Sequence, residues 1–475
     1  MPRTLADLPG PKPWPLVGNS LQIELDRFHL DLEAWARTYG PMYAVNLRGK
    51  DMVVISDPAL VREVLKRRPD QFERDSDMKI KAAEMRFDGL FTAEGAQWRK
   101  QRKLMTAAFV PKHLRTLAPE LVEITERLRG LWLERAADPE RAVFDVHADL
   151  RAYATDMTIR VAFGEDVDLL RKGGAHPLLE NLEGIFPTFH RRLMAIVPYW
   201  RYFRLPQDRT VEGQIDTLRA EVTGRIAQAR ARLDADPERA PESLLEAMIL
   251  ARDEDDPKLR LDDEEIYANA LTLLVAGEDT TSNTAAWMLY HLAREPALQA
   301  RLREEVDQKL GSARVPDLET LDAMPYTQGV VREALRLRSA APLAFLTALE
   351  PGRIGDLDYA VGQSVCLLTR VGALDQAHFG CPHAFAPSRW IDDQREASHE
   401  PHDSKSLLTF GYGPRLCPGR ALGMFELGLV AAMTARNFEL ELGPELRAPG
   451  AEPAEVFGFT MSPSPVHLRL RARVE

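Results

Sequence analysis

Cysteine is scarce in this sequence, and its spacing excludes several classes of protein. The 475 residues include three cysteines, Cys366, Cys381 and Cys417, and no two of them form a CxxC pair. An odd number of isolated thiols argues against a disulfide framework and favours a reducing compartment. We therefore expect a cytoplasmic protein.

Long apolar runs and an excess of positive charge are also lacking. No stretch approaches the ~20 apolar residues that span a bilayer, and the N-terminal MPRTLADLPGPKPWPLVGNS has neither the basic start nor the apolar run of a secretory signal. The 61 lysines and arginines are outnumbered by 72 aspartates and glutamates, so the net charge is −11. General binding of nucleic acid needs a basic face. We expect no membrane anchor and no nucleic-acid partner.

The chain reads as one unit in which helical patterns dominate. Because it has no internal repeat, low-complexity tract or long Gly/Ser linker, we expect a single domain over residues 1–475. Alternating patterns predict a hairpin over 41–56, short strands between 344 and 392, and a terminal strand in VHLRLRARV. The predicted fold class is mostly α with small β-sheets. Predicted helices lie at 25–40, 58–68, 95–109, 112–136, 145–163, 176–190, 207–234, 240–252, 262–295, 297–310 and 327–338.

One stretch, FGYGPRLCPGR at 410–420, sets a single thiol among glycines and prolines. It is not a dinucleotide loop, because Leu416 stands where GxGxxG needs its third glycine, and no histidine lies nearby to activate a nucleophile. An isolated cysteine is usually a core residue. Here the glycines allow close approach to a flat ligand, and the helix expected after Pro418 directs its N–H groups at the sulfur of Cys417. This arrangement favours a thiolate that ligates a metal.

The same stretch resembles the haem-binding signature of cytochromes P450, F-G-x-G-x-R-x-C-x-G. The resemblance implies a P450 fold, with a long central helix over the haem and the cysteine loop beneath it. It also implies one haem b as cofactor and Cys417 as the axial ligand of its iron. The match covers every fixed position of the signature, namely Phe410, Gly411, Gly413, Arg415, Cys417 and Gly419.

Two further motifs occur in the order that the family shows. In VVREALRLR, Glu333 and Arg336 lie three residues apart on one helix face, which alone describes an ordinary ion pair. The resemblance makes them the family's ExxR pair, with Arg389 of FAPSRW as the third member of a structural network. In AGEDTTSNT, Asp279 and Thr280 are implied to relay protons to dioxygen in the middle of the long helix.

A fourth motif, GAQWRKQRK at 95–103, is similar to the family's WxxxR pattern. It implies that Trp98 and Arg102, together with Arg415, contact the haem propionates. Plain core packing of Trp98 is the alternative. The neighbouring cations Arg99, Lys100 and Lys103 predict a docking face for a ferredoxin or flavodoxin-type electron donor.

The resemblance also suggests which residues line the substrate pocket. Aromatic residues make up only 7% of the chain, so we expect a mostly aliphatic pocket. The suggested pocket residues, each of which is also plausible as core, are Phe91, Leu274, Ala276, Ala344, Phe345 and Phe459, with Pro342 and Phe457 nearby; Ala276 is also expected to face the haem.

The sequence departs from the family at three positions near the haem. Thr347 stands where many members have an arginine that pairs with a propionate, and Ala373 and Leu374 replace the usual His-Arg. We expect Trp98, Arg102 and Arg415 to carry more of the propionate binding. A zinc site at His378, Cys381 and His383 is an alternative use of nearby residues, although their spacing matches no standard zinc site.

The resemblance implies a monooxygenase that works as a monomer with a separate redox partner. It would insert one oxygen atom of O2 into a lipophilic small molecule such as a fatty acid or terpenoid. A peroxide-driven peroxygenase and a non-catalytic haem sensor are the alternatives, and the Asp279–Thr280 pair argues against both.

Overall fold

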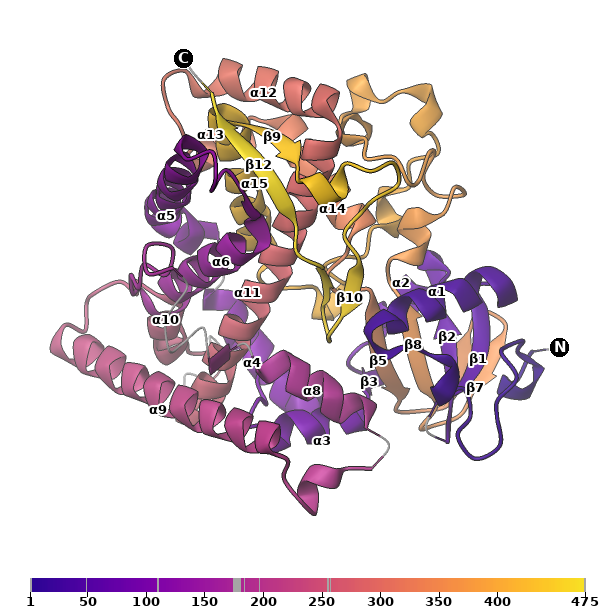
Figure 1. Cartoon of the computed structure of the whole chain (residues 1–475). Coiled ribbons are helices and arrows are strands. Elements are labelled where there is room, and N and C mark those ends of the chain that lie inside the picture. Colours follow the sequence, from indigo (N-terminus) through magenta and orange to yellow (C-terminus); the bar gives the residue numbers. More distant parts are fainter. Residues whose placement is uncertain are drawn as a thin grey trace.

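The computed structural model describes residues 2–47, 49–108, 111–173, 181–182, 184–195, 197–253, 256 and 258–473, without the side chains of 107, 108 and 111–114. Most helices gather on one side, and the largest sheet lies with the N-terminal segment on the other (Figure 1). The prediction of a mostly helical fold with small sheets is confirmed. None of the helices in the described residues is long and apolar enough to cross a membrane.

The helices follow the expected pattern closely. The helix predicted at 176–190 falls partly outside the described residues. Its C-terminal part corresponds to the start of α8. The sequence does not predict the helices at 76–84 and 318–322. The helices are α1 Phe28–Tyr39, α2 Pro58–Lys66, α3 Ser76–Glu84, α4 Gly95–Ala108, α5 Pro111–Ala137, α6 Val146–Phe163, α8 Ile185–Met194, α9 Pro206–Ala235, α10 Leu244–Leu250, α11 Asp263–Arg294, α12 Pro296–Leu310, α13 Leu318–Asp322, α14 Pro325–Leu337 and α15 Arg420–Asn437.

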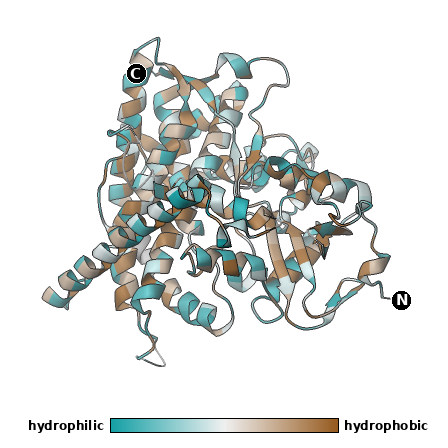
Figure 2. Ribbon diagram, turned by 60° about the horizontal axis from the view of Figure 1, so that its bottom comes forward, coloured by the Kyte–Doolittle hydropathy of each residue, from teal (hydrophilic) through white to brown (hydrophobic). Residues whose placement is uncertain are grey.

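The strands form one large sheet and three small ones. The large sheet has the order β1-β2-β8-β5-β3, in which β2 and β8 are parallel and the other pairs antiparallel. The hydropathy colouring shows much brown on the strands of this sheet (Figure 2), and β8 is buried at all five positions. The strands are β1 Met42–Leu47, β2 Lys50–Ile55, β3 Phe72–Arg74, β4 Val143–Asp145, β5 Leu343–Ala348, β6 Gly352–Ile354, β7 Leu357–Tyr359, β8 Ser364–Leu368, β9 Phe438–Leu442, β10 Glu455–Phe457, β11 Met461–Pro463 and β12 His467–Ala472.

Helix α11 runs through the middle of the helical side (Figure 1). Its 32 residues begin at a capping box, in which the Asp262 carboxylate accepts from the Glu265 backbone N–H at 2.8 Å and the Glu265 carboxylate accepts from the Asp262 N–H at 3.0 Å. It crosses α6 closely at Gly277, where an added Cβ would lie 2.4 Å from the Thr158 hydroxyl oxygen. Glycine at this point lets the two helices approach.

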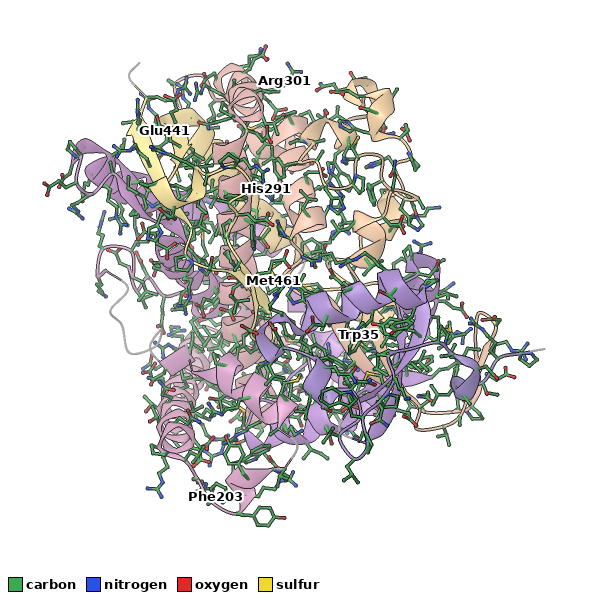
Figure 3. All side chains as sticks on the ribbon, turned by 45° about the vertical axis from the view of Figure 1, so that its right-hand side comes forward. Trp35, Phe203, His291, Arg301, Glu441 and Met461 are labelled. Atoms are coloured by element: carbon green, nitrogen blue, oxygen red, sulfur yellow. The ribbon has the colours of Figure 1, made fainter. Side chains whose placement is uncertain are left out.

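The β10–β11 hairpin lies against α11. Figure 3 labels Met461, the first residue of β11, alongside the helix that carries His291. Phe457 pairs with Met461 across the hairpin, and the Met461 N–H donates to the Ala340 carbonyl at 2.8 Å. The hairpin tip is thereby fixed between α11 and the segment that follows α14.

Candidate functional site

A cavity of about 750 Å³ lies between α11, α6, α8, α4, the β10–β11 hairpin and the cysteine loop. Cys417 lines this cavity and is exposed, with its thiol free. Phe410, Gly411, Arg415 and Gly419 line it as well. The structure thus brings the predicted signature residues together at one wall.

The loop around Cys417 is held by backbone hydrogen bonds and one close approach. The Cys417 N–H donates to the Phe410 carbonyl at 3.0 Å. Gly413 has a φ of 70°, and an added Cβ would lie 3.0 Å from the Leu65 carbonyl oxygen of α2, so a larger residue does not fit.

The sulfur of Cys417 receives opposing electrostatic influences. Burial raises the pKa of the Cys417 thiol, whereas hydrogen bonds from the Gly419 and Arg420 N–H groups and the charge of Arg102 lower it. The N-terminal end of α15 therefore stabilises a negative sulfur, as expected for a helix N-terminus.

Glu333, Arg336 and Arg389 form a fully buried network. Glu333 accepts from Arg336 Nε at 2.9 Å and Nη2 at 2.7 Å, and from Arg389 Nε at 2.9 Å. Its oxygens also accept from Trp390 Nε1 at 2.9 Å and from the Ala386 N–H at 3.0 Å.

The two guanidinium groups of this network bind backbone carbonyls of one irregular segment. Arg336 donates to the carbonyls of Ala373, Pro382 and Ala384, and Arg389 donates to those of Gly380 and Cys381. One buried carboxylate therefore ties the segment before the cysteine loop to α14.

A cluster of arginines lies at one end of the cavity. Arg68, Arg74, Arg102 and Arg415 all line it, and Glu94 is the carboxylate that pairs with two of them. Glu94 accepts from Arg68 Nη2 at 3.0 Å and forms a close ion pair with Arg415, while its Oε1 also accepts the Arg74 N–H at 2.9 Å. Within the described part of the chain, the Arg102 guanidinium has no hydrogen bond or ion pair. The cluster, which we call the arginine cluster, therefore has more positive than negative charge.

Arg415 packs against Trp98, with its guanidinium carbon 4.3 Å from the centre of the indole ring. Its Nη2 donates to the Ala93 carbonyl at 2.7 Å, and its buried Nε has no partner among the described residues. Burial lowers the pKa of Arg415 to about 9, so the group stays charged at pH 7.

Sequence reasoning missed Arg68 and Arg74. Arg74 ends β3 and pairs in register with Leu346 of β5, next to the Glu73–Thr347 pair. Arg74, a cation on the neighbouring strand, thus lies one register position from Thr347, the threonine that replaces the family's arginine. The pairing of β3 with β5 is what brings it there, and a single sequence does not reveal that pairing.

Ala276 and Thr280 of α11 line the cavity, but Asp279 is set back from it. The Thr280 hydroxyl donates to the Ala276 carbonyl at 2.8 Å. Asp279 Oδ2 accepts from the hydroxyl of Thr460, which does line the cavity, at 3.4 Å. Burial raises the pKa of Asp279, and the Arg151 charge and the Thr460 hydrogen bond oppose this.

The expected substrate-pocket residues are partly corrected. Phe91, Ala344, Phe345, Phe457 and Phe459 line the cavity. Leu274 does not: it is 1% exposed and buried in the core, because the cavity face of α11 follows Leu273, Ala276, Gly277 and Thr280 at helical spacing. Pro342 is likewise outside the lining, where Ala340, Ala341 and Leu343 lie instead.

The expectation of a mostly aliphatic pocket is confirmed, because leucine, isoleucine, valine, methionine and alanine side chains outnumber aromatic ones in the cavity lining. A cluster of aromatic rings nevertheless lies at the cavity, with the Phe459 ring 4.9 Å from that of Phe186 and 5.9 Å from that of Phe91. Phe28 and Phe87 also line the cavity. Low aromatic content of a whole chain says little about where its aromatic residues lie.

The cations expected to form a basic docking face are paired within the chain. Arg99 forms a close ion pair with Asp70, and the Lys100–Glu265 and Lys103–Asp253 distances are 2.6 and 2.7 Å. Glu278 also pairs away from the cavity, with Arg151 at 2.8 Å. The charges at 99, 100 and 103 are therefore balanced and do not form an unpaired basic face.

The zinc alternative finds no support in geometry. His378 lies 3.4 Å from Asp403, and no group of three His, Cys, Asp or Glu side chains suited to a metal ion occurs among the described residues. Ala373, which stands where the family usually has a histidine, uses its backbone carbonyl to accept a hydrogen bond from Arg336.

The sequence model described as Cytochrome P450 matches residues 8–470, so the chain belongs to the cytochrome P450 family. It is therefore an oxidoreductase, and its cofactor is haem, iron protoporphyrin IX.

Curated relatives align along nearly the whole chain. The human "25-hydroxyvitamin D-1 alpha hydroxylase, mitochondrial" is 29% identical over 472 residues, which cover 95% of this chain and 89% of the relative. The rat "1,25-dihydroxyvitamin D(3) 24-hydroxylase, mitochondrial" is 26% identical over 92% of this chain and 84% of its own length. A self-sufficient cytochrome P450 monooxygenase of Penicillium expansum is 27% identical over 92% of this chain but only 41% of its own length.

The residues at the cavity fit a haem. Cys417 lines the cavity beside a helix N-terminus, and among the described residues the buried Nε of Arg415 in the arginine cluster has no hydrogen-bond partner. A haem carries two carboxylates, and such a cluster suits them. The apolar walls suit its hydrophobic faces.

Proposed function

We propose that this chain is a single-domain monooxygenase that holds one haem b through Cys417 and inserts one oxygen atom of O2 into a lipophilic small molecule. The observation that carries the proposal is the cysteine sulfur in the wall of a large apolar cavity that also holds the arginine cluster. When bound, the haem supplies the activation of dioxygen, which consumes two electrons and two protons.

The chain's own residues bind and orient the haem. Arg102, Arg415 and Trp98 hold the propionates, and Arg68 and Arg74 add positive charge at the same end. The walls nearest the haem are formed by Phe410, Gly411, Gly419 and Ala276. Glu333, Arg336 and Arg389 act from a distance, because they fix the segment that leads into the cysteine loop.

Proton delivery falls to α11. Asp279 is the acid, and Thr280 holds the hydroxyl that faces the cavity. The buried position of Asp279 supports this role, since burial raises its pKa and keeps a proton available nearer to neutral pH.

The substrate is a fatty acid, terpenoid or related lipophile. The cluster of aromatic rings that includes Phe91, Phe186 and Phe459 favours ring-containing members of this group. The names of the two vitamin D hydroxylases among the relatives are consistent with such a ligand.

Electrons come from a separate acidic ferredoxin or flavodoxin-type protein that docks beside the cysteine loop. Arg332 of α14 and Arg420 of α15 support this site, because neither has a carboxylate partner in the described part of the chain. Arg420 lies over the Phe410 ring of the cysteine loop, and the Arg332 guanidinium is near enough to Arg420 to feel its charge. They replace the paired cations at 99, 100 and 103 as the proposed docking face. We further propose that the chain acts as a monomer in the cytoplasm.

The reduced protein with carbon monoxide tests the proposal. Thiolate ligation by Cys417 gives the strongly red-shifted absorption band typical of the family. The variant Cys417→His is the matched control, and its band is expected at the shorter wavelength of histidine-ligated haem. The short-wavelength band in freshly folded wild-type protein would refute Cys417 as the ligand.

A second measurement separates the classes of activity. Product formation with NADH, a ferredoxin and its reductase supports the monooxygenase. Product formed with hydrogen peroxide alone indicates a peroxygenase, and a spectral response to lipophiles without any product indicates a sensor.

A further inference from the structure

The hydroxyl of Thr460 stands between Asp279 and the cavity. Thr460 lines the cavity, whereas Asp279 does not, and the hydroxyl donates to Asp279 Oδ2 at 3.4 Å. The two residues are 181 positions apart in the sequence, so the β10–β11 hairpin and α11 each supply one of them.

The neighbouring hydroxyl of Thr280 is occupied within its own helix. It donates its proton to the Ala276 carbonyl at 2.8 Å. It therefore has no hydrogen left to give to Asp279 in this arrangement, although its oxygen can still accept. Among the described residues, Thr460 supplies the hydroxyl that contacts the Asp279 carboxylate.

The hairpin holds Thr460 firmly in this position. The Gly458 N–H donates to the Thr460 carbonyl at 2.9 Å, and the Met461 N–H donates to the Ala340 carbonyl at 2.8 Å. Phe459 has a φ of 88°, which is rare for a bulky residue, and this conformation directs its ring toward Phe186 and Phe189. Two backbone hydrogen bonds and one aromatic cluster thus fix the turn that carries the hydroxyl.

The charged group that acts on Asp279 comes from α6. Arg151 acts on Asp279 through its charge, and it is itself paired with Glu278 at 2.8 Å. On the hairpin side, the Thr460 hydroxyl is the polar group that faces Asp279. Thr460 therefore provides the polar contact on the side of Asp279 that leads to the cavity.

We propose that Thr460 positions Asp279 and passes its proton into the cavity. This inference rests on the proposed monooxygenase function. In the carboxylate form of Asp279, Thr460 donates to it. When Asp279 is protonated, its O–H donates to the Thr460 oxygen, and the Thr460 hydroxyl turns its own hydrogen toward a water in the cavity. One proton leaves Asp279, one leaves Thr460 toward the cavity, and the Asp279 carboxylate is then protonated again from solvent.

Infrared titration of the carboxyl band of Asp279 in the resting protein gives a readout that does not depend on turnover. The difference between wild type and Asp279→Asn assigns the band. Thr460 donates to the charged form, so Thr460→Val is expected to raise the midpoint pH of the band, and Thr460→Ser is expected to restore it. An unchanged midpoint in Thr460→Val would overturn the inference.

Turnover gives the second readout. In Thr460→Val we expect the ratio of product to NADH consumed to fall about tenfold, the equivalent of one hydrogen bond to a charged group, with a larger solvent isotope effect. Thr460→Ser retains the hydroxyl and is expected to stay near the wild-type ratio. Ser462→Ala, which removes a hydroxyl of the same hairpin that bonds the Val456 carbonyl, is the matched control and should change neither readout.

The result distinguishes this inference from the proposed function. Wild-type protein without the red-shifted carbon monoxide band would refute the proposed function itself. If wild type shows the band and forms product, and Thr460→Val matches it in midpoint and product ratio, then the role of Thr460 alone is refuted.

Discussion

Replacing Glu333 by glutamine tests the buried network at its centre. The side chain is 0% exposed, and its two oxygens accept five hydrogen bonds. Glutamine keeps the size of the side chain but removes the charge, which leaves the guanidinium groups of Arg336 and Arg389 buried without an anion. Breaking a buried ion pair in this way costs about 3–5 kcal/mol.

A loss of this size is large for any domain. Native proteins are stable by about 5–15 kcal/mol, so Glu333→Gln is expected to remove about a fifth or more of the free energy of unfolding. Chemical denaturation of the haem-bound protein, followed by the red-shifted carbon monoxide band and by circular dichroism, measures it. The control is Glu304→Gln, because Glu304 pairs with Arg301 on the outer surface (Figure 3) at 56% and 50% exposure, and its loss should cost less than about 1 kcal/mol.

The dependence on pH gives a sharper check. Burial alone would raise the pKa of Glu333, but the hydrogen bonds and charges of Arg336 and Arg389 hold it below its usual value. The stability that this lowered pKa contributes is present above the unfolded pKa, which is about 4.3, and is lost as the pH falls through the folded value. The difference between wild type and Glu333→Gln is therefore expected to shrink below about pH 4. A variant within 1 kcal/mol of wild type at pH 7 would refute the reasoning.

Three further changes test other parts of the site. Thr280→Ala is expected to lower the ratio of product to NADH about tenfold or more, since it removes the cavity-lining hydroxyl next to the acid Asp279 and positioned acid–base groups contribute roughly 10²–10⁴-fold; coupled turnover at the wild-type ratio would contradict its role. Gly277→Ala places a Cβ 2.4 Å from the Thr158 hydroxyl oxygen and should lower stability by about 1–3 kcal/mol, which calorimetry measures and which Thr158→Ala should partly relieve. Reversing Arg332 and Arg420 to glutamate is expected to slow reduction by an acidic ferredoxin, most strongly at low salt, and an unchanged rate in stopped flow would exclude this docking face.

Local patterns predicted much of the fold and the centre of the site. The central helix was expected over 262–295 and spans 263–294, because its acidic start and following proline mark both ends. Glu333 and Arg336 are three residues apart on one helix, so helical spacing alone predicts their contact. The signature around Cys417 is equally local.

Contacts between distant segments could not be predicted in this way. Arg74 reaches the arginine cluster because β3 pairs with β5, and Thr460 reaches Asp279 because a hairpin packs on α11. Leu274 was placed in the pocket because a small error in the rotation of a helix moves a residue from the cavity face to the core. The gathering of aromatic rings depends on the same tertiary packing.

The arginine cluster affects the stability of the chain before haem binds. The positive charges of Arg68, Arg102 and Arg415 repel one another at a partly buried site. Glu94 is the carboxylate that pairs with Arg68 and Arg415 there. A ligand that binds only the folded state, and brings two negative charges there, stabilises it by mass action. Newly made chains that lack haem should therefore unfold more often and be degraded sooner. The supply of haem would then set how much of this protein a cell retains, as well as how much of it is active.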